Sequence, residues 1–170
     1  MRPLPGTYPV YFDNYIPLVK ENTLLEALEN TGDSALSYLQ SIPASKQDYA
    51  YAAGKWTVKQ LLCHLNDTER IFTYRALCFA RGEQQVIPAF DEDKYVAAAK
   101  LEHLQLTDLV SDFKLIRENS IALFSSLTEE ELQRSGAAAS GQTTVLALGF
   151  AICGHLNHHL KVLKQRYICD

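Results

Sequence analysis

Residues 154–160 read Gly-His-Leu-Asn-His-His-Leu and place three of the protein's five histidines in one short segment. The flanking residues favour a helix, and residues four apart lie on one face of a helix with about 3.6 residues per turn. His155 and His159 can therefore direct their rings toward one point, as two ligands of a single metal ion would. Two histidines make an incomplete site, so the segment predicts a further ligand elsewhere in the chain.

Winding a helix over about 143–167 at about 100° per residue shows which histidines share its apolar face. His159 falls inside the apolar half, His155 lies at its edge, and His158 points outward with the lysines. We therefore expect His155 and His159 to form the pair and His158 to lie in solvent. Three ordinary helix histidines, one of them buried in the core, would give the same pattern. The apolar stripe consists of Leu148, Ile152, Leu156, Leu160, Leu163 and Tyr167.

The candidate for the third ligand is His64. A second helix is predicted over about 57–81, with Thr57 as its N-cap. Its apolar face carries Leu61, Leu65, Phe72, Ala76 and Phe79. His64 lies at the edge of that face. Helical bundles build metal sites from side chains on facing helices, so the sequence predicts a site between the second and the last helix.

Charged residues on and after the second helix are candidates for a binding pocket. The same winding turns Glu69 inward, and a buried carboxylate needs a cation, a hydrogen-bond donor or a proton. Arg75 is a candidate partner, although a separation of six residues is poor for a pair on one helix. Glu69 and Arg75 can serve either in a structural ion pair across the bundle or in contact with a substrate. Asp91, in the loop that follows this helix, is a further pocket candidate.

Four long amphipathic segments predict an all-α protein, a four-helix bundle that forms a single domain over 1–170. A short helix is also expected at about 93–99, and a capping box predicts a single turn after Thr128. Residues 135–142 are expected to be a loop, since no segment alternates as a strand does. A proline- and tyrosine-rich arm, residues 1–16, is expected to pack on the body or on a partner subunit. The long helices are expected at about 17–41, 57–81, 107–127 and 143–167. The first begins either at Pro17 or at Thr23, which has capping-box spacing to Glu26.

Composition restricts the class of protein further. A chain of 170 residues with 47% hydrophobic content can bury one sizeable core. Its formal net charge of −4 gives no basic footprint for nucleic acid. The four cysteines are widely separated and form neither a disulfide framework nor a cysteine zinc site, so reduced thiols are expected. With no signal-peptide pattern and no apolar run of membrane length, we expect a cytoplasmic protein.

Two motifs together resemble the DinB-like superfamily, in particular its YfiT-type members. One pairs Trp56 with His64 on the second helix, and the other is the pair His155 and His159 on the last helix. The resemblance covers essentially the whole chain and implies a four-helix bundle with a long crossover, often dimeric. It also implies that His64, His155 and His159 bind a divalent metal, commonly zinc or nickel. Three histidines alone do not select the metal.

Three neutral imidazoles leave coordination positions open, which is typical of a catalytic rather than a closed structural site. The resemblance implies either transfer of a low-molecular-weight thiol, such as bacillithiol, mycothiol or glutathione, or hydrolysis. We favour a metal-dependent thiol S-transferase of the bacillithiol type that acts on a small molecule. A hydrolase of unknown substrate is the alternative. A further hypothesis is a non-enzymatic, metal-stabilised homodimer, for which a closed site or no cavity is expected. Neither nucleic acid nor membrane is an expected partner.

Overall fold

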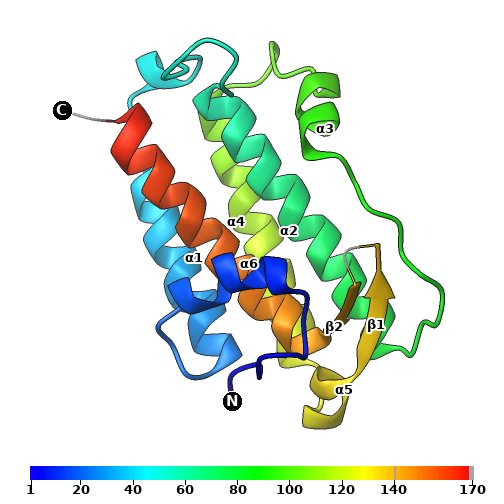
Figure 1. The fold of residues 1–170 in the computed structure, drawn as a ribbon. Helices are drawn as coiled ribbons and strands as arrows, with labels where there is room; N and C mark the ends of the chain where they lie inside the picture. Colours follow the sequence, from blue (N-terminus) through cyan, green and yellow to red (C-terminus); the bar gives the residue numbers. More distant parts are fainter. Residues whose placement is uncertain (140, 169–170) are drawn as a thin grey trace.

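The computed structural model describes residues 1–139 and 141–168 (Figure 1). Its body consists of four long helices, as the sequence predicts. Helix α2 packs against α4 and α6, and α1 packs against the same two helices, so α1 and α2 lie on opposite sides of the core. The chain is therefore a four-helix bundle. The four helices are α1 (Leu24–Gln40), α2 (Val58–Ala80), α4 (Leu106–Ser125) and α6 (Val145–Val162).

The predicted helix bounds hold to within two residues for α2 and α4. Of the two predicted starts of the first helix, Thr23 is confirmed as its N-cap and Pro17 is wrong. Helix α1 begins at Leu24 because the chain before it forms two short 3-10 turns, η1 (Val10–Asn14) and η2 (Ile16–Leu18). Proline at the second of these turns is compatible with a turn but not with the interior of a helix. Helix α6 ends at Val162 and continues as a π-helical turn, η4 (Leu163–Tyr167).

The expectation that residues 135–142 form a loop was wrong. Strands β1 (Ser135–Ala138) and β2 (Gly141–Thr144) pair as an antiparallel hairpin. These residues are mostly small, so their hydrophobic pattern carries no strand signal. The hairpin packs closely on α2, since the Phe79 ring occupies the space that a side chain at Gly136 would need. The Thr144 side chain then caps α6 by accepting from the Ala147 N–H at 3.2 Å, so the hairpin fixes where α6 begins.

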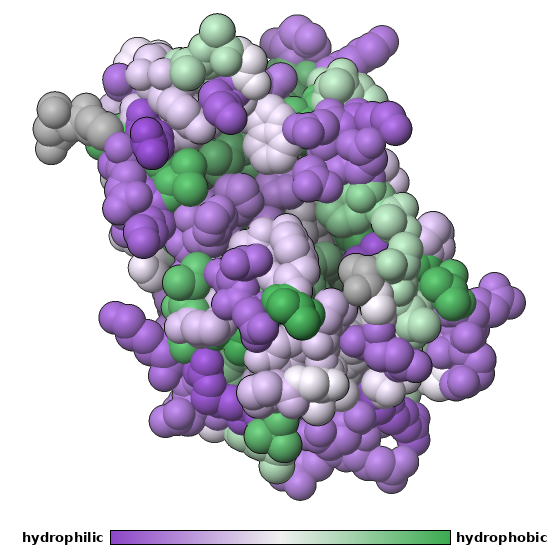
Figure 2. Space-filling view, viewed as in Figure 1, coloured by the Kyte–Doolittle hydropathy of each residue, from purple (hydrophilic) through white to green (hydrophobic). Residues whose placement is uncertain are grey.

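The N-terminal arm packs on the body, across α6 (Figure 1). The Arg2 guanidinium donates to the Val19 carbonyl at 2.9 Å and lies over the Phe150 ring of α6. Glycine is required at position 154 because the Tyr15 carbonyl group lies where a Cβ atom would be. On the face that carries the arm, the surface is mostly hydrophilic, and hydrophobic residues lie in small separate patches (Figure 2). In the part of the chain described, no helix has both the length and the hydropathy needed to cross a bilayer.

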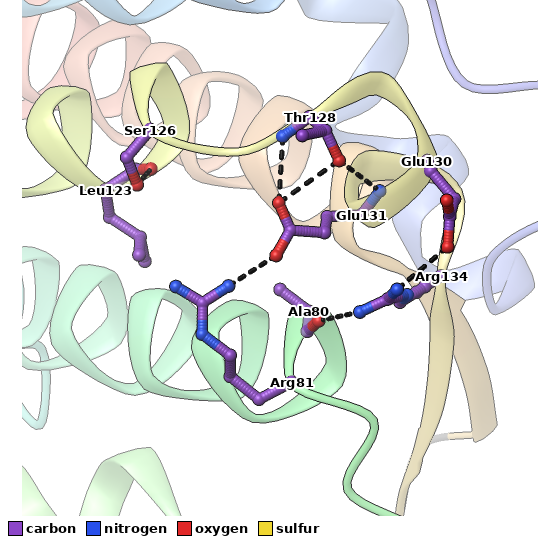
Figure 3. A network of polar contacts seen from close by, with 8 residues as sticks. All are labelled: Ala80, Arg81, Leu123, Ser126, Thr128, Glu130, Glu131 and Arg134. Carbon is purple, nitrogen blue, oxygen red and sulfur yellow. Dashed lines mark hydrogen bonds and ion pairs between the residues drawn. The ribbon is translucent and has the colours of Figure 1, made fainter.

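Two short helices, α3 (Glu92–Ala98) and α5 (Glu129–Gln133), lie in the connections. The capping box predicted at Thr128 is present, because Thr128 and Glu131 exchange backbone-to-side-chain hydrogen bonds of 2.9 and 3.2 Å (Figure 3). Glu131 also forms an ion pair with Arg81, at the end of α2. Arg134 donates to the Ala80 carbonyl at 2.7 Å. These contacts hold the connection between α4 and β1 against the end of α2.

A buried ion pair joins three helices in the core. Arg117 of α4 donates from Nε and from its second terminal nitrogen to the two carboxylate oxygens of Glu69, each at 2.8 Å. Its remaining terminal nitrogen donates to the Leu28 carbonyl at 2.8 Å and to the Thr31 hydroxyl at 3.0 Å on α1. Both charged side chains are 5% exposed. The interpretation of Glu69 as a structural ion pair across the bundle is therefore confirmed, while Arg75 as its partner was wrong.

Replacing Glu69 with leucine leaves Arg117 as an unpaired buried cation, and we expect the free energy of unfolding to fall by about 3–5 kcal/mol. The double variant Glu69→Leu/Arg117→Met removes both charges and is expected to recover most of that loss. Urea denaturation of wild type and both variants measures the difference. A loss below about 1 kcal/mol in the single variant, the range of a surface pair, would contradict this role of the ion pair.

Candidate metal centre

The three predicted histidines meet at one point between α2 and α6. His64 extends from α2, whereas His155 and His159 lie one turn apart on α6. The Nε2 atom of His155 is 3.0 Å from that of His64 and 3.1 Å from that of His159. The ligand atoms of all three lie within 4.8 Å of one another. The i,i+4 spacing on α6 and the phase of α2 thus combine into one cluster.

The arrangement fits a divalent cation. Two nitrogen ligands at about 2.0–2.1 Å from one ion are about 3–3.5 Å apart at tetrahedral or octahedral angles. The two measured separations at His155 are within or at the edge of that range. Each Nε2 atom either carries a proton and donates, or carries a lone pair and accepts. Three such atoms that face one another therefore cannot all have a matching hydrogen-bond partner. A cation at their common point accepts a lone pair from each ring.

Burial keeps all three imidazoles neutral, which is the form that binds a metal. It lowers the pKa of His64 to about 4. Burial first, and repulsion from His64 and His158 next, lower the pKa of His159 to about 3. Burial and the neighbouring histidines also hold the pKa of His155 well below its usual value. The Thr68 hydroxyl lies 3.5 Å from Nδ1 of His64, where it can help to orient the ring.

The arm changes the burial that the helix phase predicts. His155, expected at the edge of the apolar face, is only 7% exposed, because the Tyr15 ring packs edge-on against it with 5.4 Å between centroids. Tyr15 also packs against His158 at 5.6 Å, so His158 is half-buried and not in open solvent as expected. His158 nevertheless stays outside the three-histidine cluster. The helix phase describes one helix alone and cannot show which other segment packs on it.

A cavity of about 210 Å³ opens beside His64 and His155. On the face of the molecule that carries the arm, the surface is hollowed beside the arm (Figure 2). Aromatic rings from the arm, from α2 and from the loop before α3 form most of the wall. The Tyr11 and Tyr15 hydroxyls lie in this wall and hydrogen-bond to each other at 2.6 Å. The lining residues are Tyr11, Phe12, Tyr15, His64, Thr68, Phe72, Arg75, Ala89, Phe90, Glu92 and His155.

Of the three other candidates, only Arg75 lines this cavity. Glu69 is held in the ion pair of the core and does not line it. Asp91 caps α3, where its side chain accepts from the Lys94 N–H at 3.0 Å. The next residue, Glu92, lines the cavity in place of Asp91.

Tyr11 and Tyr15 were not among the residues predicted for the site. Their i,i+4 spacing in the arm is a signal, but nothing local shows that the arm folds over α6.

Comparison with known proteins places the chain in a family. The sequence matches the DinB superfamily model over residues 27–163. A protein of Oceanobacillus iheyensis named "Putative metal-dependent hydrolase" is 28% identical over 115 residues, which are 67% of this chain and 66% of that protein. The match thus spans just under two thirds of that relative's length.

Two solved structures share the fold. YfiT from Bacillus subtilis, described as "a probable metal-dependent hydrolase with an unusual four-helix bundle topology", superposes with a TM-score of 0.66 at 19% identity, over 96% of this chain and 91% of YfiT. A mycothiol-dependent maleylpyruvate isomerase gives a TM-score of 0.66 at 12% identity, over 82% of this chain and 58% of the isomerase. The family match runs from α1 to the end of α6 and includes all three clustered histidines, and the chain belongs to the DinB superfamily.

Proposed function

We propose that this protein is a metal-dependent enzyme that transfers a low-molecular-weight thiol to a small molecule. The observation that carries the proposal is the convergence of three neutral, largely buried imidazoles beside a cavity of about 210 Å³. His64, His155 and His159 would hold the ion, and zinc and nickel both suit imidazole ligands. When bound, a divalent ion supplies a Lewis acid that lowers the pKa of a coordinating thiol or water.

The cavity has few acidic residues that could act as a general base, and this favours a thiol over water as the nucleophile. A hydrolase commonly needs a general base within hydrogen-bond reach of the attacking water. Among the described residues that line the cavity, the one carboxylate is that of Glu92, which is exposed. Glu69 is committed to Arg117. A coordinating thiol is deprotonated outright and needs no separate base.

The residues of the wall supply the other functions that such a reaction needs. Phe12, Phe72 and Phe90 form an apolar surface that can bind a small organic molecule and exclude water. The Tyr11–Tyr15 hydrogen bond uses one of the two phenolic protons, so the other is free to be donated into the cavity. Burial raises the pKa of Tyr15 above its usual value, which keeps that phenol protonated and able to donate.

Hydrolysis of a small molecule is the second candidate function. The names of the Oceanobacillus iheyensis relative and of YfiT favour it. In that case Glu92 is the candidate general base. The non-enzymatic hypothesis expects a closed site or no cavity, and the cavity beside His64 and His155 counts against it. Assembly as a cytoplasmic homodimer belongs to our proposal as well.

Metal content tests the ligand set. We expect purified wild-type protein to hold close to one equivalent of zinc or nickel, and His159→Ala to lose it, because two histidines leave the ion incompletely held. His158→Ala is the matched control, since His158 is adjacent but outside the cluster, and it should retain the metal. Elemental analysis of the three proteins measures this. Wild-type protein without metal after incubation with either ion would rule out the proposed site.

Thiol dependence separates the two candidate reactions. With an electrophilic acceptor such as monochlorobimane, the metal-loaded protein is expected to conjugate bacillithiol, mycothiol or glutathione, and His159→Ala is expected to be at least about 100-fold slower. Fluorescence of the conjugate gives the rate. Hydrolysis of ester or amide substrates by the loaded protein, with no conjugation of any thiol, would favour the hydrolase.

The lowered histidine pKa values predict an acid-sensitive metal-free protein. Unfolded histidines take up protons near pH 6.5, whereas His64 does so in the folded state only near pH 4. The unfolded state therefore binds more protons between these values, and stability falls as the pH drops from about 6.5 to 4, by about 1.4 kcal/mol per pH unit for each histidine that stays neutral in the folded state. Urea denaturation at several pH values measures the slope.

The same titration has an internal control. His159→Ala removes one buried neutral imidazole and should make the slope shallower. Equal slopes for wild type and His159→Ala would mean that burial does not keep His159 neutral.

A further inference from the structure

Arg75 is a buried cation with no anionic partner in the described part of the chain. Its side chain extends from α2 into the wall of the cavity and is 6% exposed. One terminal nitrogen donates to the Pro88 carbonyl at 3.0 Å, and the buried Nε has no hydrogen-bond partner. Arg117 shows the contrast, because each of its nitrogens is bonded and its charge is balanced by Glu69.

Leaving a guanidinium in this state is costly. Burying a charge without a counter-ion is strongly unfavourable, and an unsatisfied buried donor adds to the cost. The rings of Phe72 and Phe90 lie 5.8 and 6.0 Å from the guanidinium carbon and compensate in part through their π faces. Aromatic faces do not supply the acceptor that Nε lacks. An anion in the cavity would supply both the acceptor and the balancing charge.

The position of Arg75 sets the shape of such a ligand. His64 and Arg75 are eleven residues apart on α2, about 16 Å along the helix axis. Both side chains lean toward the N-terminus of the helix, and the longer Arg75 side chain reaches further back, so the distance between their polar ends is somewhat shorter than this. Both residues line the same cavity. A ligand of about six to eight bonded atoms can therefore reach from the histidines to the guanidinium.

A carboxylate fits better than a phosphate. The planar guanidinium fork can bind the oxygens of either group, so the net charge decides between them. A single arginine balances one negative charge, whereas a phosphate group carries up to two near neutral pH. Glu92 also lines the cavity and would repel the additional charge.

We propose that the cavity binds a small molecule with a carboxylate at one end, which Arg75 receives, while its other end faces His64 and His155. The histidine end of this ligand rests on the proposed function. The carboxylate end rests on Arg75 and its surroundings alone.

Matched pairs of probes test the assignment. In the metal-loaded, full-length protein, isothermal titration calorimetry compares 6-mercaptohexanoate with 6-mercapto-1-hexanol, which differ only in the charged end. We expect wild type to bind the acid about tenfold or more tightly, the gain of a charge-assisted hydrogen bond. Arg75→Met should reduce this preference to within about twofold, and Arg75→Lys should keep part of it. Lys94→Met, which removes an exposed positive charge from α3, is the control and should retain the full preference.

Three results would overturn the proposal. The first is a preference for the acid that survives in Arg75→Met. The second is an equal loss of affinity for both probes in that variant, which would show that Arg75 only supports the loop at Pro88. The third is tighter binding of hexyl phosphate than of the carboxylate probe. Circular dichroism of each variant establishes that it is folded.

Metal analysis of the same samples separates the two proposals. Wild type that holds no metal would refute the proposed function, and hexanoate against 1-hexanol then tests Arg75 without the thiol. A preference for hexanoate that Arg75→Met abolishes would support the carboxylate site even in that case. No preference in wild type would overturn it.

Discussion

The interaction on which the rest of this structure depends is the ion pair between Glu69 and Arg117. It is bidentate, it is buried, and it extends to the Leu28 carbonyl and Thr31, so it fixes three helices relative to one another. Glu69 lies five residues after His64, about 140° further around α2. When Glu69 faces α4 and α1, His64 faces α6. Any rotation of α2 that moved His64 away from His155 would also separate the buried charges, and the cost of that separation holds the histidine in place.

The cluster of three histidines is an unfavourable arrangement by itself, and a bound cation would make it favourable. Three neutral rings direct their Nε2 atoms at one point, and burial keeps protons away from them. Without a cation, these groups are poorly satisfied in an apolar surrounding. An ion bound at this point would interact with all three nitrogen atoms. Its binding free energy would therefore stabilise the folded protein relative to the unfolded chain. The cavity beside the cluster is lined by two of these histidines, by aromatic rings and by Arg75.

The parts of the structure that the sequence predicts are those with local signals. Periodicity located the long helices, i,i+4 spacing paired His155 with His159, and capping residues marked helix starts. The misses depend on contacts between distant segments or on residues without a hydrophobic pattern. The partner of Glu69 is 48 residues away on another helix, the hairpin consists of small residues without a pattern, and the arm that buries His155 has no signal for its docking site. Asp91 and Glu92 are adjacent acids in one loop, and only the fold decides that the second lines the cavity.

Gly154 marks the place where the arm crosses the bundle. The histidines and the core ion pair lie on the bundle helices, whereas much of the cavity wall comes from the arm and from the loop before α3. An arm of different sequence can cross α6 at the same place as long as position 154 carries no side chain, because only backbone approaches it there. A change of sequence in the arm can thus alter the wall of the cavity while the three histidines keep their places on the helices.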